Sequence, residues 1–192
     1  MKITGIGFTG RMKAGKDTSA NFLKEEFLRS DEPSIQAFTQ LAFADSLKQI
    51  CMEHLGLTHH QCYDQDGKEE YNKFWGMTNR EILQRIGTEA MRNGFHKDVW
   101  AKITELRIKD AIKRNAFFII TDVRFPNEAE TIRRNGGVVV RIIRPNIESN
   151  GIVGHASEQD LPGRLIDGTV YNDGSLDDLH KKIKKLIKLT IG

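Results

Sequence analysis

The stretch that decides the fold of this chain is Gly10-Arg11-Met12-Lys13-Ala14-Gly15-Lys16-Asp17-Thr18. It follows a short, mostly apolar segment at residues 3–9, and it opens a segment at residues 16–28 in which apolar side chains recur at helical spacing. As far as Gly15-Lys16, the stretch matches the pattern of a phosphate-binding P-loop. Glycines let the backbone curl so that successive N–H groups face one anion, and the following helix N-terminus adds partial positive charge. We therefore predict a nucleotide phosphate site here.

Lys16 is the reactive side chain that this loop offers. An ammonium at this position reaches the β- and γ-phosphates of a nucleotide and follows the charge as it moves in the transition state. One position departs from the common pattern, because Asp17 stands where a serine or threonine usually holds Mg²⁺, and Thr18 follows one place later. Either the Thr18 hydroxyl takes that role or the Asp17 carboxylate supports the metal, directly or through water.

The composition is that of one ordinary globular domain. The chain has 192 residues, of which 39% are hydrophobic and 29% charged. No apolar run approaches the roughly 20 residues that cross a bilayer, and the first residues lack a signal-peptide layout. Two cysteines are too few for a disulfide framework, and a net charge of +3 does not by itself indicate nucleic-acid binding. We expect a cytoplasmic protein without membrane or nucleic-acid partners.

Strand-like and helix-like segments alternate along the chain. The predicted strands lie at residues 3–9, 36–44, 116–121, 138–143 and 168–171. The predicted helices lie at residues 16–28, 46–55, 78–93, 98–114 and 127–134 and in the lysine-rich C-terminal segment, whose lysines we expect on a solvated outer face. Residues 56–76 are predicted to form a loop or an excursion from the core, and residues 146–163 a loop. This alternation predicts a three-layer α/β P-loop fold with a parallel sheet of about five strands and helices on both faces.

The carboxyl ends of parallel strands are where ligands bind in such folds. Asp122 ends the predicted strand at 116–121, where P-loop proteins place a second acid near the metal, although a strand-ending aspartate can also cap the next helix. Arg124 is suited to clamp a phosphate because its planar guanidinium donates to two oxygens at once. The alternative for Arg124 is a surface ion pair with Glu128 or Glu130. Val123 occupies the place where motor ATPases usually carry a glutamate, which argues against that class.

Residues 78–89 predict a helix with a functional face. Thr78 and Glu81 have capping-box spacing at its start. Four polar side chains fall together at three- and four-residue spacings: Arg85, Thr88, Glu89 and Arg92. Gly87 costs about 1 kcal/mol relative to alanine in a helix, which suggests close approach of a ligand or chain. A solvated charged face with a tolerated glycine remains the alternative.

A possible metal site is suggested only weakly by His59, His60 and Cys62. No second cluster has zinc-ligand spacing, so a polar loop is the preferred interpretation.

Together these motifs resemble those of the phage-type deoxynucleoside monophosphate kinases, relatives of the adenylate kinase group. The resemblance covers most of the chain, and Lys-Asp-Thr at 16–18 looks like that family's own form of the loop. It rests on Gly15-Lys16-Asp17-Thr18, Phe43-Ala44-Asp45-Ser46-Leu47-Lys48, residues 78–89, Thr121-Asp122-Val123-Arg124, His155-Ala156-Ser157-Glu158 and Asn172-Asp173. It implies transfer of the ATP γ-phosphate to a deoxynucleoside monophosphate with Mg²⁺, in the host cytoplasm if a phage encodes the chain, by a homodimer.

The resemblance also implies roles for individual residues. Catalysis is expected from Lys16, Asp122 and Arg124, and metal binding from Asp17, Thr18 and Asp122. ATP binding is implied for Arg11, Ala14, Gly15, Lys16, Asp17, Thr18, Arg144 and Asn172. Acceptor binding is implied for Gly10, Asp45, Lys48, Lys68, Arg85, Gly87, Thr88, Glu89, Trp100, Asp122, Val123 and Arg124. Within one domain spanning residues 1–192, we expect residues 56–115 to be a helical acceptor-binding insertion and residues 145–164 a lid-like loop.

Two other functions remain open at this point. The first is a kinase of the same fold that acts on another small phosphorylated acceptor, such as dephospho-coenzyme A or phosphomevalonate. The second is a P-loop nucleotide-binding protein without transferase activity, in which binding or hydrolysis drives an interaction with DNA or a partner. The missing glutamate after Asp122 counts against the nucleotide-binding protein without transferase activity. A panel of acceptors would distinguish a kinase of another small acceptor from a deoxynucleoside monophosphate kinase.

Overall fold

The structure is a computed structural model that describes residues 3–29, 37–145 and 161–191. The chain divides into two compact units. The first, which we call the sheet unit, comprises Met1–Ala42 and Thr104–Gly192. The second, the helical unit, comprises Phe43–Ile103. In the described ranges no helix is both long enough and apolar enough to span a membrane.

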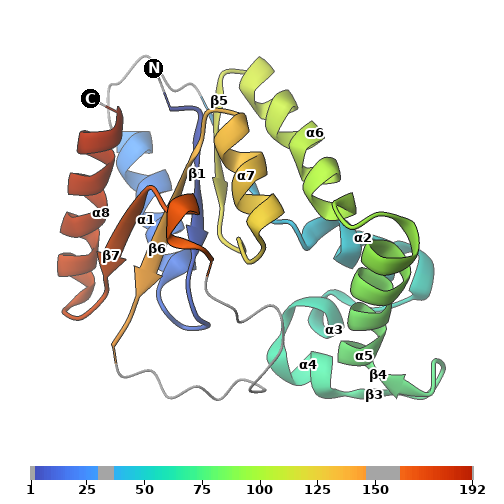
Figure 1. Cartoon of the computed structure of the whole chain (residues 1–192). Coiled ribbons are helices and arrows are strands. Elements are labelled where there is room, and N and C mark those ends of the chain that lie inside the picture. The colour runs from blue at the N-terminus through green and yellow to red at the C-terminus, as the bar shows by residue number, and fades with distance from the viewer. Residues whose placement is uncertain (1–2, 30–36, 146–160, 192) are drawn as a thin grey trace. The chain divides into compact units, whose positions relative to one another are not determined.

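The sheet unit is built on a parallel sheet (Figure 1). Its strands among the described residues are β1 (Gly5–Thr9), β2 (Ala37–Leu41), β5 (Ala116–Ile120), β6 (Val138–Ile143) and β7 (Gly168–Tyr171). They are hydrogen-bonded in the order β2-β5-β1-β6-β7, and every pairing is parallel. The central strand β1 pairs with β5 and β6, so that Ile6 lies opposite both Ile119 and Val138. The predicted five-stranded parallel sheet is confirmed.

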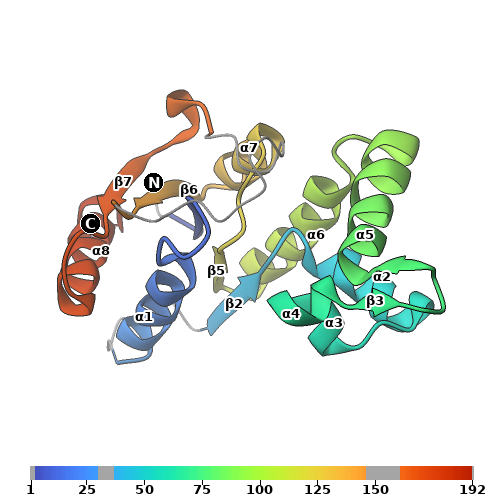
Figure 2. The same ribbon diagram turned by 90° about the horizontal axis from the view of Figure 1, so that it is seen from below.

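Helices cover both faces of this sheet (Figures 1 and 2). One face carries α1 (Lys16–Arg29) and α8 (Leu176–Ile191), and the other carries α7 (Pro126–Arg134) and, within this unit, the residues of α6 (Val99–Lys113) from Thr104 onward. The core under α1 and α8 includes Phe8, Leu23 and Ile183, each at most 2% exposed. The lysines of α8 at 181, 184 and 185 are exposed, as expected for a helix that docks through its apolar side.

Alternating glycines in β1 explain how α7 packs onto the sheet. The strand reads Gly5-Ile6-Gly7-Phe8, and successive side chains point to opposite faces. A Cβ on Gly7 would lie 2.4 Å from Cδ1 of Ile132 in α7, and one on Gly5 would lie 2.4 Å from the ring of Phe118. The missing side chains therefore leave room for Phe118 and α7 on one face, while Ile6 and Phe8 fill the other.

The helical unit contains more regular structure than its sequence predicted. Its elements are α2 (Asp45–Leu55), α3 (His59–Tyr63), α4 (Gln65–Glu69), the antiparallel pair β3 (Tyr71–Asn72) and β4 (Met77–Thr78), α5 (Asn79–Gln84), the π-helix η1 (Arg85–Phe95) and the start of α6. Of the two alternatives for residues 56–76, the irregular loop is therefore wrong, whereas an excursion from the core agrees with their place in a separate unit. The short helix α3 begins at a capping box, in which Thr58 and Gln61 exchange hydrogen bonds of 2.9 and 3.2 Å. Helices of five residues are too short for a recognisable apolar period.

The helix predicted at 78–93 is present, but its winding changes after Gln84. Thr78 and Glu81 form the predicted capping box, with the Thr78 N–H 2.7 Å from the Glu81 carboxylate. From Arg85 onward the backbone hydrogen bonds span five residues rather than four. Ile82, before this change, is buried, whereas Ala90 within η1 is exposed. Long π-helices are rare and frequently mark functional segments.

The loop predicted at 146–163 is described only at its end. Residues 161–163 lead into a short 3-10 helix, η3 (Gly163–Leu165). Most of the predicted lid-like loop at 145–164, with His155–Glu158, lies outside the described residues.

Candidate active site

The loop between β1 and α1 has the backbone conformation that a phosphate site requires. Gly10, Lys13 and Gly15 have positive φ angles of 143°, 63° and 106°. Only glycine fits at position 10, because a Cβ there would lie 2.3 Å from the carbonyl oxygen of Ile142. The Ala14 side chain is 1% exposed and belongs to the core under α1 and α8, so it anchors the middle of the loop.

The Lys16 ammonium folds over this loop. It donates hydrogen bonds of 2.8 Å to the carbonyl oxygens of Gly10 and Arg11. Burial lowers the pKa of Lys16 below its ordinary value, the Asp17 carboxylate acts in the opposite direction, the Arg124 charge lowers the pKa further, and Asp122 raises it. The charges of Asp17, Asp122 and Arg124 thus all act on the Lys16 ammonium.

The first turn of α1 presents backbone donors. Four successive N–H groups have no hydrogen-bond acceptor within the described residues: those of Gly15, Lys16, Asp17 and Thr18. The next N–H group, that of Ser19, donates to the Gly15 oxygen at 2.9 Å. N–H groups without an acceptor at a helix N-terminus, next to a half-buried ammonium, suit the binding of a polyanion.

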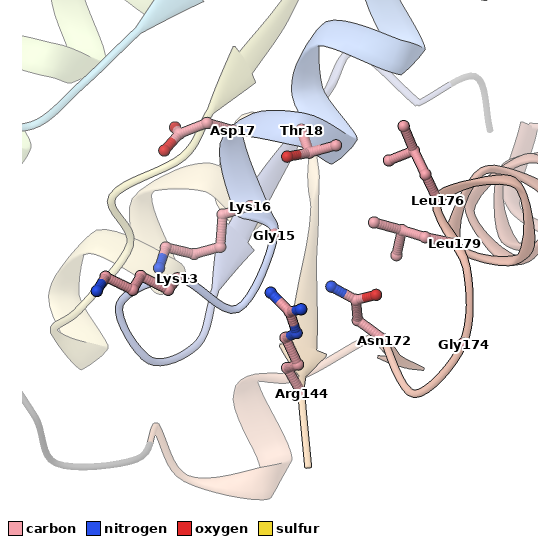
Figure 3. A pocket seen from close by; sticks show the side chains of 10 residues that line it. All are labelled: Lys13, Gly15, Lys16, Asp17, Thr18, Arg144, Asn172, Gly174, Leu176 and Leu179. Atoms are coloured by element: carbon pink, nitrogen blue, oxygen red, sulfur yellow. The ribbon is translucent and has the colours of Figure 1, made fainter. Parts of the chain in front are cut away.

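A cleft of about 290 Å³ opens beside this helix end (Figure 3). Six of the residues predicted to bind ATP line it: Gly15, Lys16, Asp17, Thr18, Arg144 and Asn172. Of the other two, Arg11 is an exposed residue of the loop and Ala14 is buried beneath it. Four lining residues were not predicted: Lys13, Gly174, Leu176 and Leu179. The last three follow β7 in the chain. They could have been predicted from the rule that ligands bind at the carboxyl ends of parallel strands.

The segment after β5 carries Asp122, Val123 and Arg124. Its backbone is fixed to the sheet by a 3.3 Å hydrogen bond from the Val123 N–H to the Phe8 oxygen. The buried carboxylate of Glu128 accepts the backbone N–H groups of Arg124 and Phe125, at 2.8 and 3.1 Å.

The Glu128 carboxylate supplies the acceptor for two N–H groups at the start of α7. Glu130 lies 3.9 Å from Arg164, and the Arg124 guanidinium forms no ion pair with a residue that the structure describes. Arg124 is exposed, as a side chain that clamps a phosphate must be.

The donors near the loop fit Mg²⁺ by their chemistry. Asp17 and Thr18 in the first turn of α1, with Asp122 after β5, offer only oxygen atoms, which Mg²⁺ prefers, and Mg²⁺ in nucleotide sites is held by one or two such groups plus phosphates. Elsewhere, His60 lies 2.8 Å from Asp64 and 3.5 Å from Glu70, while Cys62 is buried. Within the described ranges no group of three or more histidine, cysteine or acidic side chains is arranged to hold a metal.

The helical unit holds the other predicted acceptor residues. Asp45 begins α2, and the ammonium of Lys48 lies 3.8 Å from the centre of the Tyr63 ring. Lys68 donates to the Tyr63 carbonyl oxygen at 2.8 Å. Two lysines from different helices therefore meet at Tyr63.

The π-helix η1 exposes Arg85, Thr88 and Glu89, whereas Gly87 faces inward. A Cβ on Gly87 would lie 2.7 Å from Cδ2 of Leu47, so this glycine permits close packing of η1 on α2. Trp100 is 3% exposed, and its indole N–H donates to the Gly87 oxygen at 2.9 Å. In this unit Gly87 and Trp100 thus support the helix that carries the three exposed polar residues.

A parallel sheet with a glycine-rich loop after its central strand, a half-buried lysine and a helix N-terminus defines a P-loop fold. A dephospho-CoA kinase from Campylobacter jejuni has this fold, with a TM-score of 0.55 and 18% identity over 100% of this chain and 98% of that chain.

Closer relatives are found by sequence. The family model described as deoxynucleotide monophosphate kinase matches residues 34–183. A putative deoxynucleotide monophosphate kinase of Acanthamoeba polyphaga mimivirus is 32% identical over 190 residues, which cover 93% of each chain. The deoxynucleotide monophosphate kinase of Enterobacteria phage T4 is 29% identical over 188 residues, 91% of this chain and 72% of that protein. The chain belongs to the deoxynucleotide monophosphate kinase family, and the resemblance drawn from its motifs is confirmed.

Proposed function

We propose that this protein transfers the γ-phosphate of ATP to a deoxynucleoside monophosphate, giving ADP and the deoxynucleoside diphosphate. The observation that carries the proposal is the Lys16 ammonium, held by the phosphate loop and acted on by the charges of Asp17, Asp122 and Arg124, next to four N–H groups at residues 15–18 that have no acceptor in the described part of the chain. Membership of the family supports the acceptor class.

The reaction needs positioning and charge neutralisation rather than a strong base. An oxygen of the acceptor phosphate attacks the γ-phosphorus in line, and the bond from that phosphorus to the bridging oxygen of ADP breaks. The acceptor phosphate is already a competent nucleophile near neutral pH. Lys16 and the loop N–H groups bind the transferring phosphate, and Arg124 neutralises charge on the acceptor or transferring group. Asp17, Thr18 and Asp122 would hold Mg²⁺, which when bound neutralises the β- and γ-phosphates.

The residues proposed to bind the acceptor fall into two sets. One set is Gly10 with Asp122, Val123 and Arg124 in the sheet unit, and the other is on the helical unit: Asp45, Lys48, Lys68, Arg85, Gly87, Thr88, Glu89 and Trp100. The helical segment 56–115 would serve as an acceptor-binding insertion and the segment 145–164 as a lid. We also propose that the enzyme works as a homodimer in the cytoplasm, without nucleic acid.

A panel of acceptors tests the proposed function. Purified protein is incubated with ATP and Mg²⁺ and one acceptor at a time, and both products are quantified. The panel contains the four common deoxynucleoside monophosphates, their ribose counterparts, dephospho-coenzyme A and phosphomevalonate. Stoichiometric ADP and deoxynucleoside diphosphate are expected. Transfer only to dephospho-coenzyme A or phosphomevalonate, or ATP hydrolysis that rises with DNA but not with any acceptor, would refute the proposal.

A further inference from the structure

The side chain of Asn172 is bound to the phosphate loop. Its amide nitrogen donates a hydrogen bond of 2.9 Å to the carbonyl oxygen of Ala14. The same nitrogen would lie 2.8 Å from a Cβ at Gly15, so the carboxamide lies directly against the loop (Figure 3). The Asn172 backbone is fixed independently, because its N–H donates to the Ile143 oxygen at 2.7 Å where β7 ends beside β6.

This bond controls the direction of one phosphate-facing N–H group. The Ala14 carbonyl and the Gly15 N–H belong to one planar trans peptide, in which the two bonds point in opposite directions. Fixing the carbonyl therefore fixes the N–H, which has no acceptor within the described residues. Gly15 needs such a restraint, because with a φ of 106° and no side chain its neighbouring peptide planes can rotate at little cost.

Two other carbonyl groups of the loop also accept hydrogen bonds. Lys16 binds the Gly10 and Arg11 oxygens, and the Arg11 oxygen also accepts the Ala14 N–H at 3.2 Å. Lys16 does not bind the Ala14 oxygen, which accepts its hydrogen bond from Asn172 instead. An asparagine suits this position because a carboxylate of the same shape has no hydrogen to donate.

We propose that Asn172 is a positioning residue of the phosphate loop, which holds the Ala14–Gly15 peptide so that the Gly15 N–H faces the nucleotide phosphates. Its effect falls on the phosphate chain rather than on the base or ribose. The inference rests on the proposed function, since it presupposes that the loop binds ATP. It gives Asn172 an indirect part in ATP binding, through the loop.

Lys182 provides a matched control. Its ammonium donates to the Tyr171 oxygen at 2.9 Å and pairs with Asp173, so it restrains the residues on both sides of Asn172 without touching the phosphate loop. Lys182→Ala therefore loosens the same turn and leaves the Ala14 carbonyl bound. Asn172→Ala removes the donor, and Asn172→Asp replaces it with an isosteric acceptor.

The experiment measures binding of ATP and of inorganic tripolyphosphate, both with Mg²⁺, by calorimetry, together with melting temperature. Asn172→Ala is expected to weaken both ligands by the same factor, about fivefold for one hydrogen bond, and Asn172→Asp by more. In turnover assays the KM for ATP should rise by a similar factor while that for the monophosphate stays unchanged. Lys182→Ala should bind both ligands like wild type even where its melting temperature falls.

Each contrary result has a distinct meaning. Loss of ATP affinity with unchanged tripolyphosphate affinity would show that Asn172 contacts the nucleoside, which overturns the inference alone. Unchanged affinities in both Asn172 variants, or an equal loss in Lys182→Ala, would overturn it as well. Wild-type protein that binds neither ATP nor tripolyphosphate would instead refute the proposed function.

Discussion

Glu105 of α6 and Arg134 of α7 form a two-point ion pair, with Arg134 Nη2 2.6 Å from Oε2 and Nε 3.1 Å from Oε1. The Glu105 side chain is 16% exposed and also lies 3.1 Å from the Lys109 ammonium. The hydrogen bonds from Arg134 hold the pKa of Glu105 at about 2, and those from Lys109 and Asn135 act in the same direction. This pair therefore joins two helices on one face of the sheet by a charge-dependent contact.

The pair predicts a defined pH dependence of stability. Because the folded-state pKa of Glu105 lies below its ordinary value of 4.5, its contribution is complete above about pH 5 and is lost as the pH falls toward 2. Glu105→Gln should lower the free energy of unfolding by about 1 kcal/mol at pH 7, since solvent screens part of the interaction. Urea unfolding between pH 7 and pH 4 should show this difference narrowing below pH 5. The control Glu130→Gln, at a looser pair 3.9 Å from Arg164, should change little at any pH, and an equal effect of both variants would contradict the assignment.

The packing of α7 on β1 predicts a coupling between Gly7 and Ile132. Gly7→Ala places a Cβ 2.4 Å from Cδ1 of Ile132 and 2.9 Å from Cγ2 of Val123, so it should destabilise the fold by about 1–3 kcal/mol. Ile132→Val removes that Cδ1 and alone costs about 0.5–1.5 kcal/mol. The double variant should be clearly more stable than the sum of the two losses predicts, as measured by denaturant unfolding. Strict additivity would mean that the two residues do not compete for the same space.

Removal of the Lys16 ammonium should abolish most activity without unfolding the protein. Loss of one charge that stabilises the transition state lowers turnover by about 10²–10³ or more. We expect Lys16→Ala to show this loss with a melting temperature close to that of wild type. Lys24→Ala, an exposed lysine of the same helix, is the matched control and should retain full activity. Near-normal turnover of folded Lys16→Ala would disprove the assignment of the loop.

The metal dependence separates Asp17 from Thr18. If the Asp17 carboxylate supports Mg²⁺, then Asp17→Asn should raise the Mg²⁺ concentration for half-maximal rate several-fold, because the ion loses a negative neighbour. Thr18→Ala should then have the smaller effect. Titration of Mg²⁺ at saturating ATP measures both. The reverse ranking would assign the ion to the Thr18 hydroxyl.

Local signals carried most of the fold prediction. The continuous apolar run at 116–121 and the glycine-rich loop at 10–15 each determine their own conformation, and the pair Thr78–Glu81 caps its helix as two residues three apart can. The phosphate side of the site was predictable for the same reason, since Gly15 to Thr18 are contiguous.

The rest depends on contacts that no local pattern encodes. The π winding of η1 uses hydrogen bonds five residues apart, yet its sequence is equally compatible with an α-helix. Leu176 and Leu179 line the cleft only because β7 ends next to the loop after β1, which pairing through β6 brings about. Trp100 is likewise buried in contact with Gly87, thirteen residues away, whose oxygen accepts its indole N–H.

The exposed arginine of η1 gives the sharpest test of the acceptor side. Arg85 is exposed with Thr88 and Glu89 on a helix whose inward glycine is packed against Leu47. If Arg85 binds the acceptor phosphate, Arg85→Ala should weaken deoxynucleoside monophosphate binding about 10- to 150-fold, the effect of one charge-assisted bidentate contact. ATP affinity should stay unchanged, because the ATP cleft is lined by residues of the sheet unit.

Parallel titrations of dTMP, dGMP, dCMP and ATP against wild type and Arg85→Ala decide the question. Lys97→Ala removes one exposed positive charge just beyond η1 and controls for long-range electrostatics. If both variants lost the same affinity for every ligand, the effect of Arg85→Ala would be explained by the change in net charge alone. No loss for any monophosphate would exclude Arg85 from the acceptor site. The acceptor phosphate would then have to be bound by Arg124, the exposed arginine after β5 whose charge reaches Lys16.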